Sequence, residues 1–225
     1  MPVHRTPQIS SRKQPKQARS AELVSVILSA AVQVLTKEGA ARFTTARVAE
    51  KAGVSIGSLY QYFPNKAAIL FQLQKDEWRQ TAGMLQDLLE DDRKPPPERL
   101  RALVHSFIRS ECEEAELRVA LNDAAPLYRD APEAKEGKTA GNQAVRKFIQ
   151  EALAEVSDEA RLLAGELIMT TLYSVGKRFS EQPRTPAEIE AYAEAMADMF
   201  CAYLRACRHD SAAPSSPEWH AKHRP

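Results

Sequence analysis

The chain has 225 residues, of which 44% are hydrophobic and 27% are charged, and its formal net charge is +1. This composition is typical of a soluble globular protein and excludes a chain that is disordered along most of its length. The longest apolar stretch, residues 23–35, is shorter than the ~20 residues that span a bilayer. No apolar run follows the basic residues at the N-terminus, so we expect no signal peptide, no membrane partner and a cytoplasmic location.

The charge is distributed unevenly. Residues 1–66 contain ten Lys and Arg against three Asp and Glu, whereas residues 67–225 contain 21 against 27. Such asymmetry between segments indicates different partners, and the N-terminal third is suited to an anion. The three cysteines form no closely spaced pair, which favours reduced thiols and predicts no metal site.

Helix-forming residues dominate and no long stretch alternates apolar with polar residues, so we predict an all-α fold. Residues 1–17 are basic and contain three prolines, which predicts a flexible arm. Apolar residues at helical spacing from Val24 to Leu35 predict a first helix that stops near Gly39. Thr185 and Glu188 form a capping pattern for the last helix. The further helices are expected at residues 45–52, 56–62, 66–90, 98–111, 116–125, 141–156, 158–179 and 186–208, followed by a disordered tail at 209–225.

Residues 45–62 have the pattern of a helix-turn-helix. Two short helices that meet at a steep angle need a small residue where they touch and a residue in the left-handed conformation at the turn. Ala49 and Gly53 meet these needs, and Ser55 is placed to cap the following helix. In such a motif the second helix lies in the major groove of DNA.

The candidate DNA-binding residues lie on these two helices and just after them. Gln61 is suited to a bidentate contact with adenine, and Tyr60 and Lys66 to phosphate contacts. Ser55 is also explained as a cap, and Tyr62 as part of the core. The full set is Thr45, Arg47, Ser55, Gly57, Ser58, Tyr60, Gln61, Tyr62 and Lys66.

Residues 18–68, and above all Phe43-Thr44-Thr45, Ala52-Gly53-Val54-Ser55 and 57–66, strongly resemble the DNA-binding domain of the tetracycline-repressor-like (TetR) regulators. That family usually has His where Tyr62 stands. The resemblance implies a DNA-binding domain at residues 18–66 and a larger helical domain at 67–208 that binds a small effector and dimerises. It also implies a homodimer on a palindromic double-stranded DNA operator.

The C-terminal helices offer candidate residues for both remaining roles. Apolar and small residues on the last two helices predict a dimer interface that includes Leu167, Ile168, Leu172, Val175, Tyr192, Met196, Met199, Phe200 and Tyr203. Aromatic residues with a few polar ones predict a largely apolar effector site that includes Trp78, His105, Phe107, Arg109, Asn122, Tyr128, Phe148, Thr170 and Tyr173.

The resemblance implies an effector-responsive regulator, most simply a repressor that its effector releases from DNA, although activation stays open. An enzyme is one alternative, but the chain has no hydrolase, zinc-protease, P-loop or dinucleotide fingerprint, so we expect no catalytic residues and no cofactor. A second alternative is a ligand-binding dimer that no longer recognises DNA.

Overall fold

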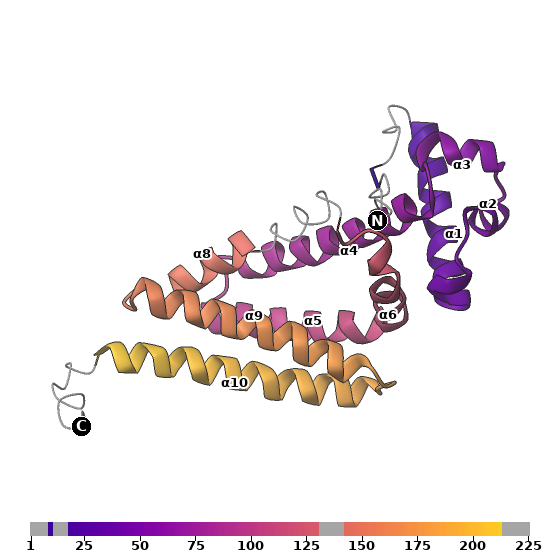
Figure 1. The fold of residues 1–225 in the computed structure, drawn as a ribbon. Helices are drawn as coiled ribbons and strands as arrows, with labels where there is room; N and C mark the ends of the chain where they lie inside the picture. The colour runs from indigo at the N-terminus through magenta and orange to yellow at the C-terminus, as the bar shows by residue number, and fades with distance from the viewer. Residues whose placement is uncertain (1–8, 11–17, 131–141, 213–225) are drawn as a thin grey trace, which may run out of the picture. The chain divides into compact units, whose positions relative to one another are not determined.

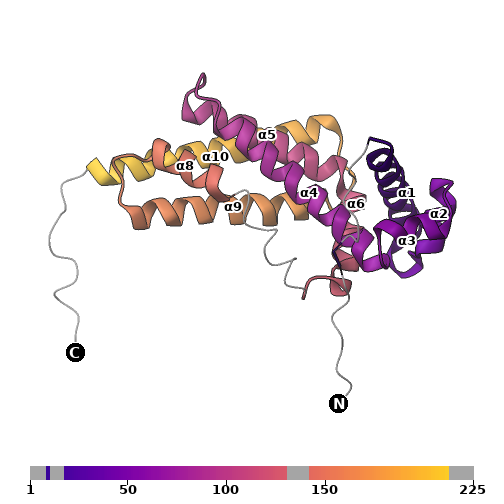
Figure 2. The ribbon, with the colours of Figure 1, turned by 90° about the horizontal axis from the view of Figure 1, so that it is seen from above.

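The computed structural model describes residues 9–10, 18–130 and 142–212, and every regular element within these ranges is a helix (Figures 1 and 2). The all-α prediction is therefore confirmed. The α-helices are α1 (Ala18–Arg42), α2 (Thr45–Ala52), α3 (Ile56–Tyr62), α4 (Lys66–Leu89), α5 (Pro96–Glu113), α6 (Ala115–Ala124), α8 (Asn142–Ala152), α9 (Asp158–Ser180) and α10 (Pro186–Ala212), and a 3₁₀ turn η1 covers Ala125–Leu127.

The helices form two compact units. Of the described residues, the first unit contains those up to Met84 together with residues 110–130, and the second contains Leu85–Arg109 and residues 142–212. The expected domain boundary after residue 66 is placed at the end of the helix-turn-helix motif. Packing instead groups the motif with the first part of α4 and with α6, which lies against α1.

Helix α1 is the central helix of the first unit. Residues Ser20–Arg42 have the length and mean hydropathy, 1.4, of a membrane span. The apolar stretch at residues 23–35 is by itself shorter than a membrane span. However, Ile27, Ala31 and Leu35 are fully buried and belong to the same hydrophobic core as Phe43, Leu59 and Phe63. The apolar face of α1 is thus explained by the burial of hydrophobic surface within this unit. Gly39, with φ 76° and ψ 167°, interrupts α1 at the predicted stop, and a short helical turn follows it.

Two terminal segments differ from the expectation. Ile9, which lies within the predicted flexible arm, is only 2% exposed and belongs to the core of the first unit. At the other end, α10 continues to Ala212 and takes in the first four residues of the predicted tail. The rest of the arm and of the tail lies outside the described residues.

Helices α9 and α10 lie side by side in the second unit (Figures 1 and 2). Phe179 and Tyr192 stack with ring centroids 4.0 Å apart, and the Arg184 guanidinium lies 4.6 Å from the Phe179 centroid. The predicted capping of α10 is present, because the Glu188 carboxylate accepts a hydrogen bond from Thr185 N at 2.7 Å. This hydrogen bond lowers the pKa of Glu188. The turn between the two helices is therefore fixed by stacking and capping together.

The turn of the helix-turn-helix provides a stability prediction. Gly53 ends α2 with φ 67° and ψ 28°, a conformation that costs L-residues about 1 kcal/mol or more. We therefore expect Gly53→Ala to lower the free energy of unfolding by about 1 kcal/mol. A Cβ at Gly57, within α3, would meet Ser55 Oγ at 3.8 Å, an ordinary contact distance, so Gly57→Ala should not lower it. Urea unfolding followed by circular dichroism measures both, and equal losses would contradict this account.

Candidate functional site

The two helices of the motif are held by matched caps and a shared core. The Thr44 side chain accepts a hydrogen bond from Arg47 N at 3.3 Å at the start of α2. Ser55 does the same for α3, where its Oγ accepts from Ser58 N at 3.0 Å. Val48 of α2 and Leu59 of α3 are fully buried. These contacts fix which side of α3 faces the core and leave the opposite side exposed.

The exposed side of α3 carries three of the nine predicted DNA-binding residues. Gly57, Tyr60 and Gln61 are exposed, and the Tyr60 hydroxyl is hydrogen-bonded to Thr45 Oγ1 at 3.1 Å. This bond links α3 to the first residue of α2 and restrains the Tyr60 side chain. Lys66 is half-buried at the start of α4. The structure thus brings these residues to one end of the first unit, and their contact with DNA stays a prediction.

Three of the predicted DNA-binding residues also have structural roles. Ser55 and Ser58 are joined by their hydroxyl groups at 2.8 Å, in addition to the backbone cap. Tyr62 is only 6% exposed and packs in the core of the first unit. For Ser55 and Tyr62 the sequence permits both a structural and a DNA-binding role, and Ser55 caps α3 while Tyr62 lies in the core.

An ion pair that the sequence does not reveal joins α1 and α2. The Arg47 guanidinium on α2 contacts the Glu38 carboxylate on α1, and both side chains remain about one-third exposed, at 39% and 31%. The spacing within the motif does not reveal this pair, because its members lie on two helices separated by the break at Gly39. Arg47 is therefore partly neutralised in the protein without DNA.

The predicted effector residues of the first unit differ in their surroundings. The Phe71 ring packs against Trp78 and Tyr128, with centroids 6.4 and 5.9 Å away. The buried Tyr128 hydroxyl lies 3.1 Å from both Gln74 Oε1 and Leu121 O, and burial raises the pKa of Tyr128 to about 12. Asn122 is exposed. Trp78 and Tyr128 thus contribute to a core.

The predicted effector residues of the second unit also serve different contacts. Phe107 packs edge-on against Tyr173 at 5.0 Å, and Phe148 lies 5.6 Å from the Arg99 guanidinium. His105 has both ring nitrogens close to carboxylates of α10, with Nδ1 3.1 Å from Glu190 and Nε2 2.8 Å from Glu194. Two further predicted effector residues lie in this unit: Arg109 pairs with Glu190 at 3.6 Å, and Thr170 is exposed. These polar side chains are thus spread over the packing of α5 against α10 and the surface of α9.

A polar network inside the first unit was also missed. Arg118 of α6 lies 2.9 Å from Glu77 of α4 and 3.0 Å from Glu114, and it also contacts Glu111 and Ser110. One guanidinium therefore forms ion pairs with three carboxylates. Burial raises the pKa of Glu77, and the Arg118 charge opposes that shift. The network ties α4, which begins four residues after α3 ends, to α5 and α6.

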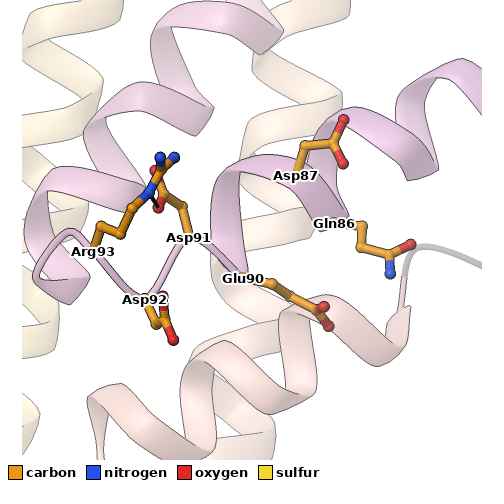
Figure 3. A pocket seen from close by; sticks show the side chains of 6 residues that line it. All are labelled: Gln86, Asp87, Glu90, Asp91, Asp92 and Arg93. Atoms are coloured by element: carbon orange, nitrogen blue, oxygen red, sulfur yellow. Dashed lines mark hydrogen bonds and ion pairs between the residues drawn. The ribbon is translucent and has the colours of Figure 1, made fainter.

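A hollow of about 310 Å³ lies at the connection between α4 and α5 (Figure 3). Its lining is strongly polar and consists of Gln86, Asp87, Glu90, Asp91, Asp92 and Arg93. Arg93 Nε lies 2.6 Å from Asp91, and this hydrogen bond lowers the pKa of Asp91. None of the predicted effector residues lines it, and its carboxylates do not suit an apolar ligand.

Comparison with known families finds two matches. Residues 95–207 match the family described as the tetracyclin repressor-like C-terminal domain. Residues 27–73 match the bacterial regulatory proteins of the tetR family. The first match covers half of the chain, and the second contains α2, α3 and the start of α4.

Individual relatives match over shorter stretches. Nucleoid occlusion factor SlmA from Vibrio campbellii is 41% identical over 84 residues, which are 36% of this chain and 42% of that protein. The fatty acid metabolism regulator protein of Bacillus subtilis is 35% identical over 68 residues, 30% of this chain and 33% of that protein. The chain thus aligns with less than half the length of these relatives.

Solved structures share the fold over most of the chain. A putative TetR-family regulator from Mesorhizobium loti superimposes with a TM-score of 0.65 at 17% identity, covering 83% of this chain and 98% of that one. FadR from Bacillus subtilis, solved in complex with stearoyl-CoA, gives 0.58 at 17% identity, covering 78% and 96%. Likeness at this level of identity concerns the fold.

The ion pair between Glu38 and Arg47 leads to a prediction on DNA binding. Because Glu38→Gln removes the charge that neutralises Arg47, it should raise affinity for random-sequence duplex and steepen the plot of log Kd against log salt by about one unit. Fluorescence anisotropy at several salt concentrations measures both quantities. Glu50→Gln, the same charge change at an exposed position of α2, is the control. Identical slopes for Glu38→Gln and the unchanged protein would contradict a masking role.

Proposed function

This chain belongs to the TetR family of bacterial transcriptional regulators, and from that membership we propose that it is an effector-responsive repressor that binds a palindromic operator as a homodimer. The observation that carries the DNA-binding part is the exposed side of α3, which presents Tyr60 and Gln61 while caps and buried side chains hold the helix. A repressor must lie in the same compartment as the chromosome, so the proposal includes a cytoplasmic location.

The proposed DNA contacts follow from the chemistry of this surface. Gln61 has both a donor and an acceptor, which match the adenine edge in the major groove. Tyr60, Thr45 and Lys66 supply groups that bind phosphate oxygens and so fix the register of the protein. The excess of basic residues in 1–66 supports the sequence-independent part of the affinity.

The proposed dimer uses the outer faces of α9 and α10. Leu163 is 61% exposed, and Leu162, Leu167 and Met199 are also exposed, so α9 and α10 leave several large apolar side chains uncovered in the protomer. Of the residues predicted from the sequence, Ile168, Leu172, Met196 and Phe200 are buried within the protomer. The proposed interface therefore keeps Leu167 and Met199, adds Leu162 and Leu163, and has the half-buried Val175, Tyr192 and Tyr203 beside them.

The proposed effector is a small, largely apolar molecule that favours a conformation with low affinity for the operator. Such a ligand releases the protein only if it binds the two states with different affinities. Long-chain acyl-CoA is the first class to test, because the Bacillus subtilis fold relative was solved with stearoyl-CoA. Equal affinity of stearoyl-CoA for free and operator-bound protein would exclude it as the effector.

Operator recognition can be tested without knowing the target genes. The full-length protein should select a palindromic consensus from a pool of random duplexes, and anisotropy then measures affinity for that duplex. Gln61→Ala should weaken binding by about 1–3 kcal/mol per half-site and relax the preference at one base pair. Val26→Ala, on the exposed surface of α1, is the control and should bind normally. A pool that yields no consensus would refute operator recognition.

The dimer interface can be tested by adding one charge. In sedimentation at micromolar concentration the unchanged protein should be a dimer, and Leu163→Asp should shift it to monomer, because an unpaired charge is costly in an apolar interface. Val119→Asp is a matched control, since Val119 is 49% exposed but lies on α6. A Leu163→Asp protein that dimerises as strongly as the Val119→Asp protein would rule out this interface.

A further inference from the structure

Helix α3 carries a large apolar side chain that its core does not use. Ile56, the first residue of the helix, is 42% exposed. The buried side of α3 is formed by Leu59 and Tyr62, which are 0% and 6% exposed. The cap of α3 is provided by Ser55 and not by Ile56, so capping does not require an apolar residue at this position.

The surroundings of Ile56 leave it accessible at the side of α3 that faces outward. Ser55 and Ser58 are hydrogen-bonded to each other through their hydroxyls, so these neighbouring polar groups are already engaged in the cap. Gly57 has no side chain, and a Cβ built there would have Ser55 Oγ, at 3.8 Å, as its nearest neighbour. Tyr60 lies one turn further along, at the i+4 position on the same face. Ile56 therefore stands beside bare backbone at the N-terminal turn of the recognition helix.

We propose that Ile56 is a specificity-determining residue that contacts the C5-methyl group of a thymine in each operator half-site. This inference rests on the proposed DNA-binding function. The N-terminal residues of a recognition helix approach base edges, and the thymine methyl is the apolar group that a base pair presents in the major groove. An isoleucine side chain has no hydrogen-bonding group, so it is matched to this methyl and to no donor or acceptor on a base.

The groups around Ile56 favour DNA over an apolar protein partner. Residues 1–66 carry a surplus of basic side chains, and the apolar Ile56 is flanked on its helix by Tyr60 and Gln61, whose polar groups suit phosphate and adenine. A docking site for a protein would be expected to offer a contiguous apolar patch. The exposed side of α3 instead alternates apolar and polar groups, as a base-reading surface does.

The test removes the methyl group and nothing else. Each thymine of the selected operator is replaced in turn, in both half-sites, by deoxyuridine, and anisotropy measures the affinity of the full-length protein. We expect one thymine position at which the replacement weakens binding about fourfold for each half-site. With Ile56→Ala, the unmodified operator should bind more weakly and the same replacement should have no further effect.

The controls separate this inference from the function on which it rests. Val26→Ala alters an apolar side chain of the same exposed fraction, 42%, on α1, and should retain the full deoxyuridine penalty. The deoxyuridine series with the unchanged protein needs no variant, so a folding defect in Ile56→Ala does not obscure the result. Circular dichroism verifies the fold of each variant.

Two results would overturn the inference while leaving the function intact. One is tight binding to the selected operator with no thymine at which deoxyuridine lowers affinity. The other is a penalty of equal size in the unchanged protein and in Ile56→Ala, which would assign the methyl contact to another residue. Absence of any sequence-selective binding would instead refute the proposed function, and the inference with it.

Discussion

The burial of Leu59 beside Val48 is the contact on which the candidate DNA surface depends. Helix α3 has only seven residues, and a helix of this length is not stable on its own. It exists because Leu59 and Tyr62 are buried against the first unit and because Ser55 caps it. Once that side is buried, the helical period leaves Ile56, Tyr60 and Gln61 outside. One side of this short helix thus stabilises the first unit, and the opposite side forms the candidate DNA surface.

Several charged side chains in this protein form ion pairs that join helices. Arg47 pairs with Glu38, Arg118 serves three carboxylates, and His105 lies between Glu190 and Glu194. The Arg118 network, which includes Glu77 of α4, also places partly buried charges in the unit that carries the recognition helix. Breaking one partner of such a network leaves the others unpaired, which makes the packing of α4 sensitive to local change.

The helices and the motif were predictable because their signals are local. Gly53 adopts the left-handed turn, Ser55 caps α3, and Thr185 with Glu188 caps α10, all as the spacing of residue types predicts. No local signal of this kind identifies an effector site, and the effector residues stay a prediction. Trp78, Tyr128 and Phe107 are aromatic residues at helical positions, and helical period does not distinguish a core from a binding cavity. The structure uses all three in packing.

The sequence by itself determined the helical fold, the helix-turn-helix and the family, because capping, turn conformation and hydrophobic period act between residues that are close in the chain. Only the tertiary structure decided which apolar residues remain outside. Leu163 and Ile168 lie on the same helix, yet the first is exposed and the second is buried. Likewise Glu38 meets Arg47 across the break at Gly39. Such choices depend on which helices pack together, and that information is absent from the local spacing of residues.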